Sequence, residues 1–177
     1  MLRVAILGLA GLLVVANSSA PAATAGAAGG GARLSVVASF YPLYEFAKRV
    51  GGERAEVRNL VPAGAEPHDY EPTPRDMVAL TRAKIVVYNG AGLEPWIARV
   101  LRQLPRGTVV VNASAGLRLV KRNGIDPHVW LDPVLAQQQA ANIAAGFARA
   151  DPAGRGVYEA NAARLRGDLQ ALHGRFA

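Results

Sequence analysis

The sequence predicts an α/β fold in which a parallel sheet is flanked by helices. Short apolar runs rich in Val and Ile alternate with segments of helical pattern, and Gly, Pro or Asn separates the two kinds of segment. Strands that alternate with single helices imply right-handed crossovers, which make the strands parallel. The chain has 177 residues, 51% of them hydrophobic and 19% charged, which is enough for one domain with a hydrophobic core.

The local pattern places each element. We expect strands at residues 34–40, 55–61, 85–88 and 108–111. We expect helices at residues 42–50, 73–83, 95–104, 133–150 and 154–176. Thr73-Pro74 is typical of a helix start, because the Thr hydroxyl can cap the first turn and Pro suits the first helical position. Gly51-Gly52 is typical of a helix end.

The two ends of the chain predict export and a connection to a further lobe. Residues 1–22 have the pattern of a signal peptide: a positive start, an apolar run too short for a comfortable membrane span, and small residues at a cleavage site. Residues 23–33 are interpreted as a flexible tether and 34–150 as an α/β lobe. Residues 151–177 carry an apolar face that continues to the last residues, so we expect the start of a long linking helix. We therefore expect an exported, periplasmic protein.

Composition excludes several classes of site. The chain has no cysteine, which excludes disulfides, thiolate metal sites and thiol catalysis. The formal net charge is +7, but the basic residues are scattered, so we expect no nucleic-acid partner. The acidic residues are concentrated instead: six of the 13 lie within residues 66–76 and 126–132. The local field in these two segments favours a cation.

The most informative feature is a pair of histidines in matching local frames. His68 lies in Glu-Pro-His-Asp-Tyr-Glu-Pro, and His128 lies in Asp-Pro-His-Val-Trp-Leu-Asp-Pro. Each frame reads acid, Pro, His, any residue, aromatic, and then a second acid-Pro pair. The prolines restrict the backbone and disfavour helix, so each imidazole sits on a stiff loop and loses little entropy when a ligand fixes it. This favours a metal site.

The predicted topology joins the two histidines. His68 follows the second strand and His128 follows the fourth, and parallel sheets bind ligands beyond the carboxyl ends of their strands. Neutral imidazole is a common ligand of zinc and related divalent metals, and its other N–H is usually held by a carboxylate. Several acids are near enough in sequence to do this: Glu66, Asp69, Glu71, Asp126 and Asp132. We expect Tyr70 and Trp130 to pack the loops against the sheet.

Catalysis has little support in the sequence. There is no His-Glu-x-x-His helix and no Gly-x-Ser-x-Gly elbow, and Ser39 and Ser114 have no motif that pairs them with a base. Asn89-Gly90-Ala91-Gly92 lacks the remainder of a phosphate-binding loop and is interpreted as a tight turn. We expect no enzyme. A metal-dependent hydrolase and an adhesin-like surface interaction protein remain as alternatives.

With these motifs in place, the chain resembles the zinc/manganese solute-binding proteins of bacterial ABC importers. The matching segments are residues 36–43, 51–52, 60–62, 67–74, 89–96 and 126–133, with Tyr158 and Asn161 of the last helix. The resemblance implies two α/β lobes joined by a long helix, with His68 and His128 as direct metal ligands. It also implies delivery of the ion to a membrane permease by a monomeric receptor. We expect Zn²⁺ first and Mn²⁺ as the alternative.

Three departures from the family pattern bear on this expectation. The sequence ends in what resembles the linking helix, so we expect these residues to lack the lobe that, in the family, supplies the remaining ligands. The segment 113–126 is short and has no histidine-rich insert, unlike many zinc-specific members. No lipid-anchor cysteine is present, which favours a Gram-negative periplasm.

Overall fold

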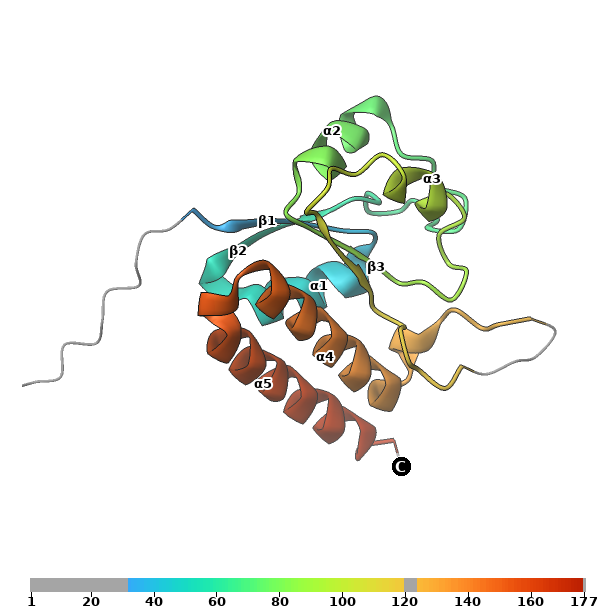
Figure 1. Ribbon diagram of the computed structural model, residues 1–177. Coiled ribbons are helices and arrows are strands. Elements are labelled where there is room, and N and C mark those ends of the chain that lie inside the picture. Colours follow the sequence, from blue (N-terminus) through green and yellow to red (C-terminus); the bar gives the residue numbers. More distant parts are fainter. Residues whose placement is uncertain (1–31, 120–123, 177) are drawn as a thin grey trace, which may run out of the picture. The chain divides into compact units, whose positions relative to one another are not determined.

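The computed structural model describes residues 32–119 and 124–176 (Figure 1). The predicted signal peptide and most of the predicted tether lie outside these residues. The described part contains a sheet of four strands, which are β1 (Leu34–Ala38), β2 (Ala55–Asn59), β3 (Ile85–Tyr88) and β4 (Val109–Asn112). The strands are all parallel and lie in the order β2-β1-β3-β4. The predicted parallel sheet is therefore confirmed.

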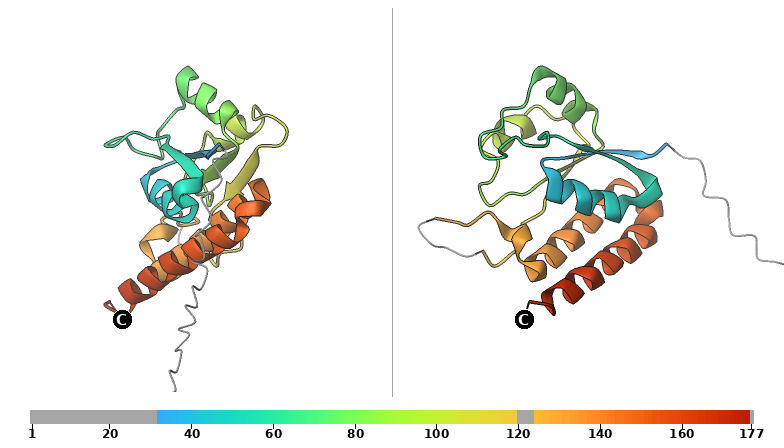
Figure 2. Two further views of the ribbon diagram at one scale, coloured as in Figure 1. Left: turned by 90° about the vertical axis from the view of Figure 1, so that its left-hand side faces the viewer. Right: turned by 180° about the vertical axis from the view of Figure 1, so that it is seen from behind.

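Five α-helices accompany the strands. They are α1 (Tyr41–Gly51), α2 (Pro74–Arg82), α3 (Ile97–Leu101), α4 (Pro133–Ala150) and α5 (Arg155–His173). Helices α1, α4 and α5 lie on one face of the sheet, and α2 and α3 lie on the other (Figures 1 and 2). Three short 3₁₀ turns complete the described elements: η1 (Gly52–Arg54), η2 (Val129–Leu131) and η3 (Pro152–Gly154).

The alternation of side chains along the strands gives the sheet two buried faces. Val36, Ile85 and Val87 join the core beneath α1, α4 and α5. Val37 and Val86, one position along, join a second core with side chains of α2 and α3. Successive residues of a strand point to opposite faces, and both faces of β3 are covered, so this strand is a continuous apolar run, whereas the edge strand β2 alternates apolar and polar residues.

Two helix starts follow from their cap residues. The Thr73 hydroxyl accepts the backbone N–H of Asp76, whose carboxylate in turn accepts the backbone N–H of Thr73, which completes a capping box at α2. The Asp132 carboxylate accepts the backbone N–H of Val134, at 2.8 Å, and caps α4. Helix α1 ends at Gly52, whose φ of +52° suits glycine.

Helix α3 is shorter than the sequence pattern predicts. The expected helix over residues 95–104 is α-helical only at Ile97–Leu101. After it the backbone tightens, because the Gln103 N–H bonds the carbonyl of Val100, three residues back. The residue before Pro105 is disfavoured in helix, which explains the early end.

Helix α5 packs into the lobe along its first half. Tyr158, Asn161 and Leu165 are buried, and the Asn161 amide donates to the carbonyl of Val50 at 2.8 Å. Phe176 is 82% exposed, so the apolar face leaves the core toward the end of the helix. The role of this segment as a linking helix stays a prediction. Within residues 32–119 and 124–176, none of the helices has the length and apolar character needed to cross a membrane.

Candidate metal centre

The two predicted histidines meet at the carboxyl edge of the sheet. His68 lies in the loop that follows β2, and His128 lies in the loop that follows β4. Their Nε2 atoms are 3.3 Å apart, and the ring centroids are 5.4 Å apart with the rings inclined by 59°. Residues 60 positions apart in the chain thus face each other through the same ring nitrogen, as the parallel topology predicts.

Asp126 sets the orientation of the His128 ring. Its Oδ1 atom lies 2.8 Å from His128 Nδ1 and also accepts the His128 backbone N–H at 3.0 Å. The backbone bond and then the ring bond hold the pKa of the Asp126 carboxyl below its usual value. A neutral imidazole that donates its Nδ1–H to this carboxylate carries its lone pair on Nε2, which is the atom that faces His68.

The other predicted acids do different work. The Glu66 carboxylate accepts the backbone N–H of His68 at 3.2 Å, which stiffens the loop without touching the ring. Glu71 forms an ion pair with Arg99, and Asp132 caps α4. The two histidine frames match in sequence but differ in structure. Asp126 contacts the ring of His128, whereas Glu66 contacts the backbone of His68.

Aromatic side chains tie the His128 loop to the core, as predicted. The Trp130 ring meets Phe40 edge-on, with centroids 4.6 Å apart, and lies 5.3 Å from the His128 ring. Phe40 lies two residues beyond β1 and is only 4% exposed. The aromatic pair thus holds the base of the loop against the buried end of the central strand.

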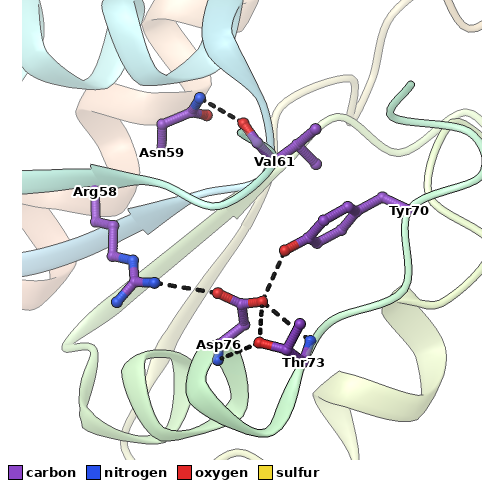
Figure 3. A network of polar contacts seen from close by, with 6 residues as sticks. All are labelled: Arg58, Asn59, Val61, Tyr70, Thr73 and Asp76. Atoms are coloured by element: carbon purple, nitrogen blue, oxygen red, sulfur yellow. Dashed lines mark hydrogen bonds and ion pairs between the residues drawn. The ribbon is translucent and has the colours of Figure 1, made fainter. Parts of the chain in front are cut away.

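The His68 loop is tied down through Tyr70 (Figure 3). The Tyr70 hydroxyl donates to the Asp76 carboxylate at 2.7 Å, and Arg58 of β2 pairs with the same carboxylate at 3.1 Å. Burial, and then the bond to Asp76, raises the pKa of Tyr70 to about 12. The phenol therefore stays protonated, and remains a donor, throughout the physiological range.

The Asn89-Gly90 turn holds buried polar groups that the sequence analysis missed. Glu94 is 3% exposed, and its carboxylate accepts the backbone N–H of Asn89 at 2.6 Å and that of Gly90 at 3.0 Å. The Ser39 hydroxyl donates to it at 2.7 Å. Burial raises the pKa of Glu94 despite these three bonds. The signal was present, since an acid directly follows a glycine turn between apolar residues.

The Ser39–Glu94 pair does not form a hydrolytic site. Ser39 is 2% exposed, and Glu94 is buried to a similar extent. A nucleophile needs access to its substrate and a base poised to take its proton. This hydroxyl instead stabilises a buried carboxylate, so the pair is structural.

The histidine pair fits two positions of a tetrahedral metal shell. Zinc–nitrogen bonds of about 2.0–2.1 Å at tetrahedral angles place two donor nitrogens about 3.3–3.4 Å apart. The observed separation of the Nε2 atoms is 3.3 Å. Across residues 32–119 and 124–176, no cluster of three or more His, Asp or Glu side chains has metal-binding geometry. Among the described residues, the histidine pair therefore has the spacing expected of two donors to one ion.

Comparison with known proteins places this geometry in a family. The profile of ZnuA, the periplasmic zinc-uptake complex component A, matches residues 36–177. The chain belongs to this zinc-uptake component A family. The ZnuA protein of Bacillus subtilis, named a high-affinity zinc uptake system protein, is 37% identical over 159 residues. The alignment covers 80% of this chain and 50% of that protein.

Further members bind different metals by name. A manganese-binding lipoprotein, MntA of Halalkalibacterium halodurans, is 37% identical over 144 residues, which cover 80% of this chain and 48% of that protein. The crystal structure of the Zn(II)-bound ZnuA-like domain of Streptococcus pneumoniae AdcA superposes with a TM-score of 0.78 at 34% identity. That match covers 82% of this chain and 55% of the solved one. The chain spans about half the length of the curated relatives it matches.

Proposed function

We propose that this chain is the metal-capturing N-terminal lobe of an extracytoplasmic solute-binding protein. The lobe captures a divalent transition metal, Zn²⁺ first and Mn²⁺ next, as cargo for an ABC-type permease. The observation that carries the proposal is the 3.3 Å separation of the His68 and His128 Nε2 atoms, which suits two donors of one ion. Membership of the zinc-uptake component A family supports it.

The site acts by presenting two neutral imidazoles in a prepared geometry. Asp126 keeps the His128 proton on Nδ1, so that Nε2 is available to the metal. Two nitrogens supply half of a tetrahedral shell, and the other half comes from water or from a second lobe. Because the relatives are about twice as long as this chain, a second lobe is the natural source of the missing donors.

The proposed partner rests on the named relatives, and the proposed location rests on the N-terminal segment. Relatives named as components of zinc uptake systems support a permease in the membrane as the docking partner of a monomeric receptor. The apolar N-terminal segment supports export to the periplasm.

The test is zinc affinity measured by chelator competition on the purified chain. We expect binding weaker than nanomolar, because half of the shell lacks protein donors. His68→Ala and His128→Ala should each weaken binding at least tenfold, whereas His173→Ala, at the end of α5, serves as the matched control and should bind like wild type. Sub-nanomolar affinity would contradict the proposal that this chain supplies only two of the four metal donors. Undiminished binding by both alanine variants would contradict the assignment of the ligands.

We expect no catalytic turnover from this site. A hydrolase needs a base poised beside the metal-bound water, and Asp126, the carboxylate beside the pair, is already bonded to the His128 ring and backbone. Zinc-loaded protein should therefore leave simple ester and phosphate substrates unchanged. Turnover that disappears in both histidine variants would favour the enzyme over the receptor.

A further inference from the structure

The spacing of the two histidines depends on loops that are themselves half exposed. The His128 side chain is 45% exposed, and Asp126, which orients it, is 58% exposed. In the described residues, His68 lies in no helix or strand, and His128 directly precedes the short 3₁₀ turn η2. Each loop is instead bonded to a polar side chain rooted in the body of the lobe.

Asn89 anchors the His128 loop. It follows β3 directly and is fully buried, and its Nδ2 atom donates to the carbonyl of Pro127 at 2.9 Å. Its Oδ1 atom accepts from the amide of Gln139 in α4, at 3.0 Å, and Gln139 is also fully buried. The amide of Asn89 thus links the loop to the end of a central strand and to the helix that follows the loop.

The Asn89 bond acts on the peptide that carries His128. The Pro127 ring restricts φ, so fixing the Pro127 carbonyl fixes the plane of the peptide that joins it to His128. That plane sets the direction from which the imidazole leaves the backbone. The same carbonyl also accepts the Val129 N–H at 2.9 Å, so both sides of the loop converge on it.

Tyr70 anchors the other loop two residues beyond His68. Its hydroxyl bonds Asp76, which is 5% exposed and belongs to the capping box of α2 (Figure 3). Asp76 also receives the Thr73 hydroxyl at 2.6 Å and is paired with Arg58 of β2. The loop is thereby tied to a helix start and to an edge strand at one point.

We infer that Asn89 and Tyr70 are positioning residues, each of which holds one histidine at the separation that a single metal ion requires. The inference rests on the proposed metal site. Neither side chain touches the space between the two Nε2 atoms; each works through the backbone of its own loop. When the loops are already ordered, binding loses less conformational entropy. Loss of an anchor therefore lowers the affinity for the metal without removing a donor atom.

The inference makes a prediction that a purely structural role does not. Loss of an outer-shell contact lowers metal affinity by about 10–100-fold, and we expect about tenfold for Asn89→Ala and for Tyr70→Phe. Spacing matters only while two donors share the ion. The loss should therefore vanish when Asn89→Ala is placed in a His68→Ala background, where His128 binds alone.

The experiment measures zinc affinity by NMR titration, which reaches the weak binding of single-histidine variants. Asn161→Ala is the matched control for Asn89→Ala, because it removes a buried amide that donates to a backbone carbonyl outside the two histidine loops, that of Val50. Tyr44→Phe is the control for the lost hydroxyl of Tyr70. Both controls should bind zinc within twofold of wild type.

A second readout needs no metal. Backbone order parameters of the metal-free protein should fall at His128 in Asn89→Ala and at His68 in Tyr70→Phe, with the other loop unchanged. Should Asn89→Ala fail to fold, Tyr70→Phe, which removes a single oxygen, carries the same test.

The outcomes separate the two proposals. If Asn89→Ala and Tyr70→Phe bind zinc like wild type while both histidine variants lose binding, the positioning role is contradicted and the metal site is supported. A tenfold loss that persists in the His68→Ala background would also overturn them. If removing either histidine changes nothing, the metal site itself fails, and the order parameters then decide whether Asn89 and Tyr70 position the loops.

Discussion

Removing the Asp126 carboxylate should weaken zinc binding about tenfold. Asp126 Oδ1 lies 2.8 Å from the His128 Nδ1 atom, where it can accept an N–H bond and so favours the tautomer that carries its lone pair on Nε2. Loss of such a partner costs about 10–100-fold in metal affinity. The carboxylate is 58% exposed, so water competes for the same bond, and the lower end of that range applies to Asp126→Ala. Asp126→Asn keeps an acceptor oxygen but loses the charge, and its affinity should fall between wild type and Asp126→Ala.

The assay is competition with a chromophoric chelator at neutral pH and fixed ionic strength. Asp69→Ala is the matched control, because Asp69 is an exposed acid directly beside His68 and its removal changes the local charge by the same amount. We expect the control to bind within twofold of wild type. An equal loss in both variants would show that the general acidic field, not orientation of the ring, carries the effect. Wild-type affinity in Asp126→Ala would refute the reasoning altogether.

Two further predictions concern the scaffold. Gly146→Ala should lower the free energy of unfolding by about 1–2 kcal/mol, because overpacking costs about 1–3 kcal/mol while helix propensity returns at most about 1 kcal/mol. The added Cβ would lie 2.2 Å from Val111 Cγ2. The control is Gly167→Ala on α5, where a Cβ meets nothing within 4 Å, so this variant should be more stable than wild type. Urea unfolding of both variants measures the two changes in free energy. Hydrogen bonds from Tyr158 and then Arg54 lower the pKa of Asp151. The ionised carboxylate therefore stabilises the folded protein above about pH 4, and this stabilisation is lost as the pH falls through the pKa of the folded state. Asp151→Asn should therefore destabilise the protein more at pH 7 than at pH 3, and an equal cost at both pH values would contradict this assignment.

Much of the fold was predictable because its signals are local. The strand at Ile85–Tyr88 and the helix at Pro133–Ala150 have the predicted bounds, since apolar runs, proline starts and capping residues all act over a few neighbours. The Thr73 cap was also predicted and is confirmed as a complete capping box. The helix over residues 95–104 was predicted too long, because its end depends on how the chain tightens before Pro105.

The candidate site was predictable in part. The matched Pro-His frames identify the two imidazoles, and the parallel order of the strands brings both to one edge, because parallel strands end together. The sequence pattern did not single out Asp126 among five neighbouring acids as the partner of a ring. Nor did it reveal Asn89 and Gln139, whose bond joins residues 50 positions apart.

By itself, then, the sequence determined the strand and helix pattern, the stiffness of the two loops and the chemical identity of the proposed metal donors, since each of these is written in a few consecutive residues. Only the tertiary structure decided that the two Nε2 atoms lie 3.3 Å apart. It also decided that Asn89, just after β3, bonds both the His128 loop and Gln139 of α4, and that Asp76 of α2 bonds Tyr70 of the His68 loop. The physical reason is range: a donor-to-donor distance between residues 60 positions apart depends on the packing of every element between them, and hydrogen bonds to loop carbonyls form only after that packing has excluded water.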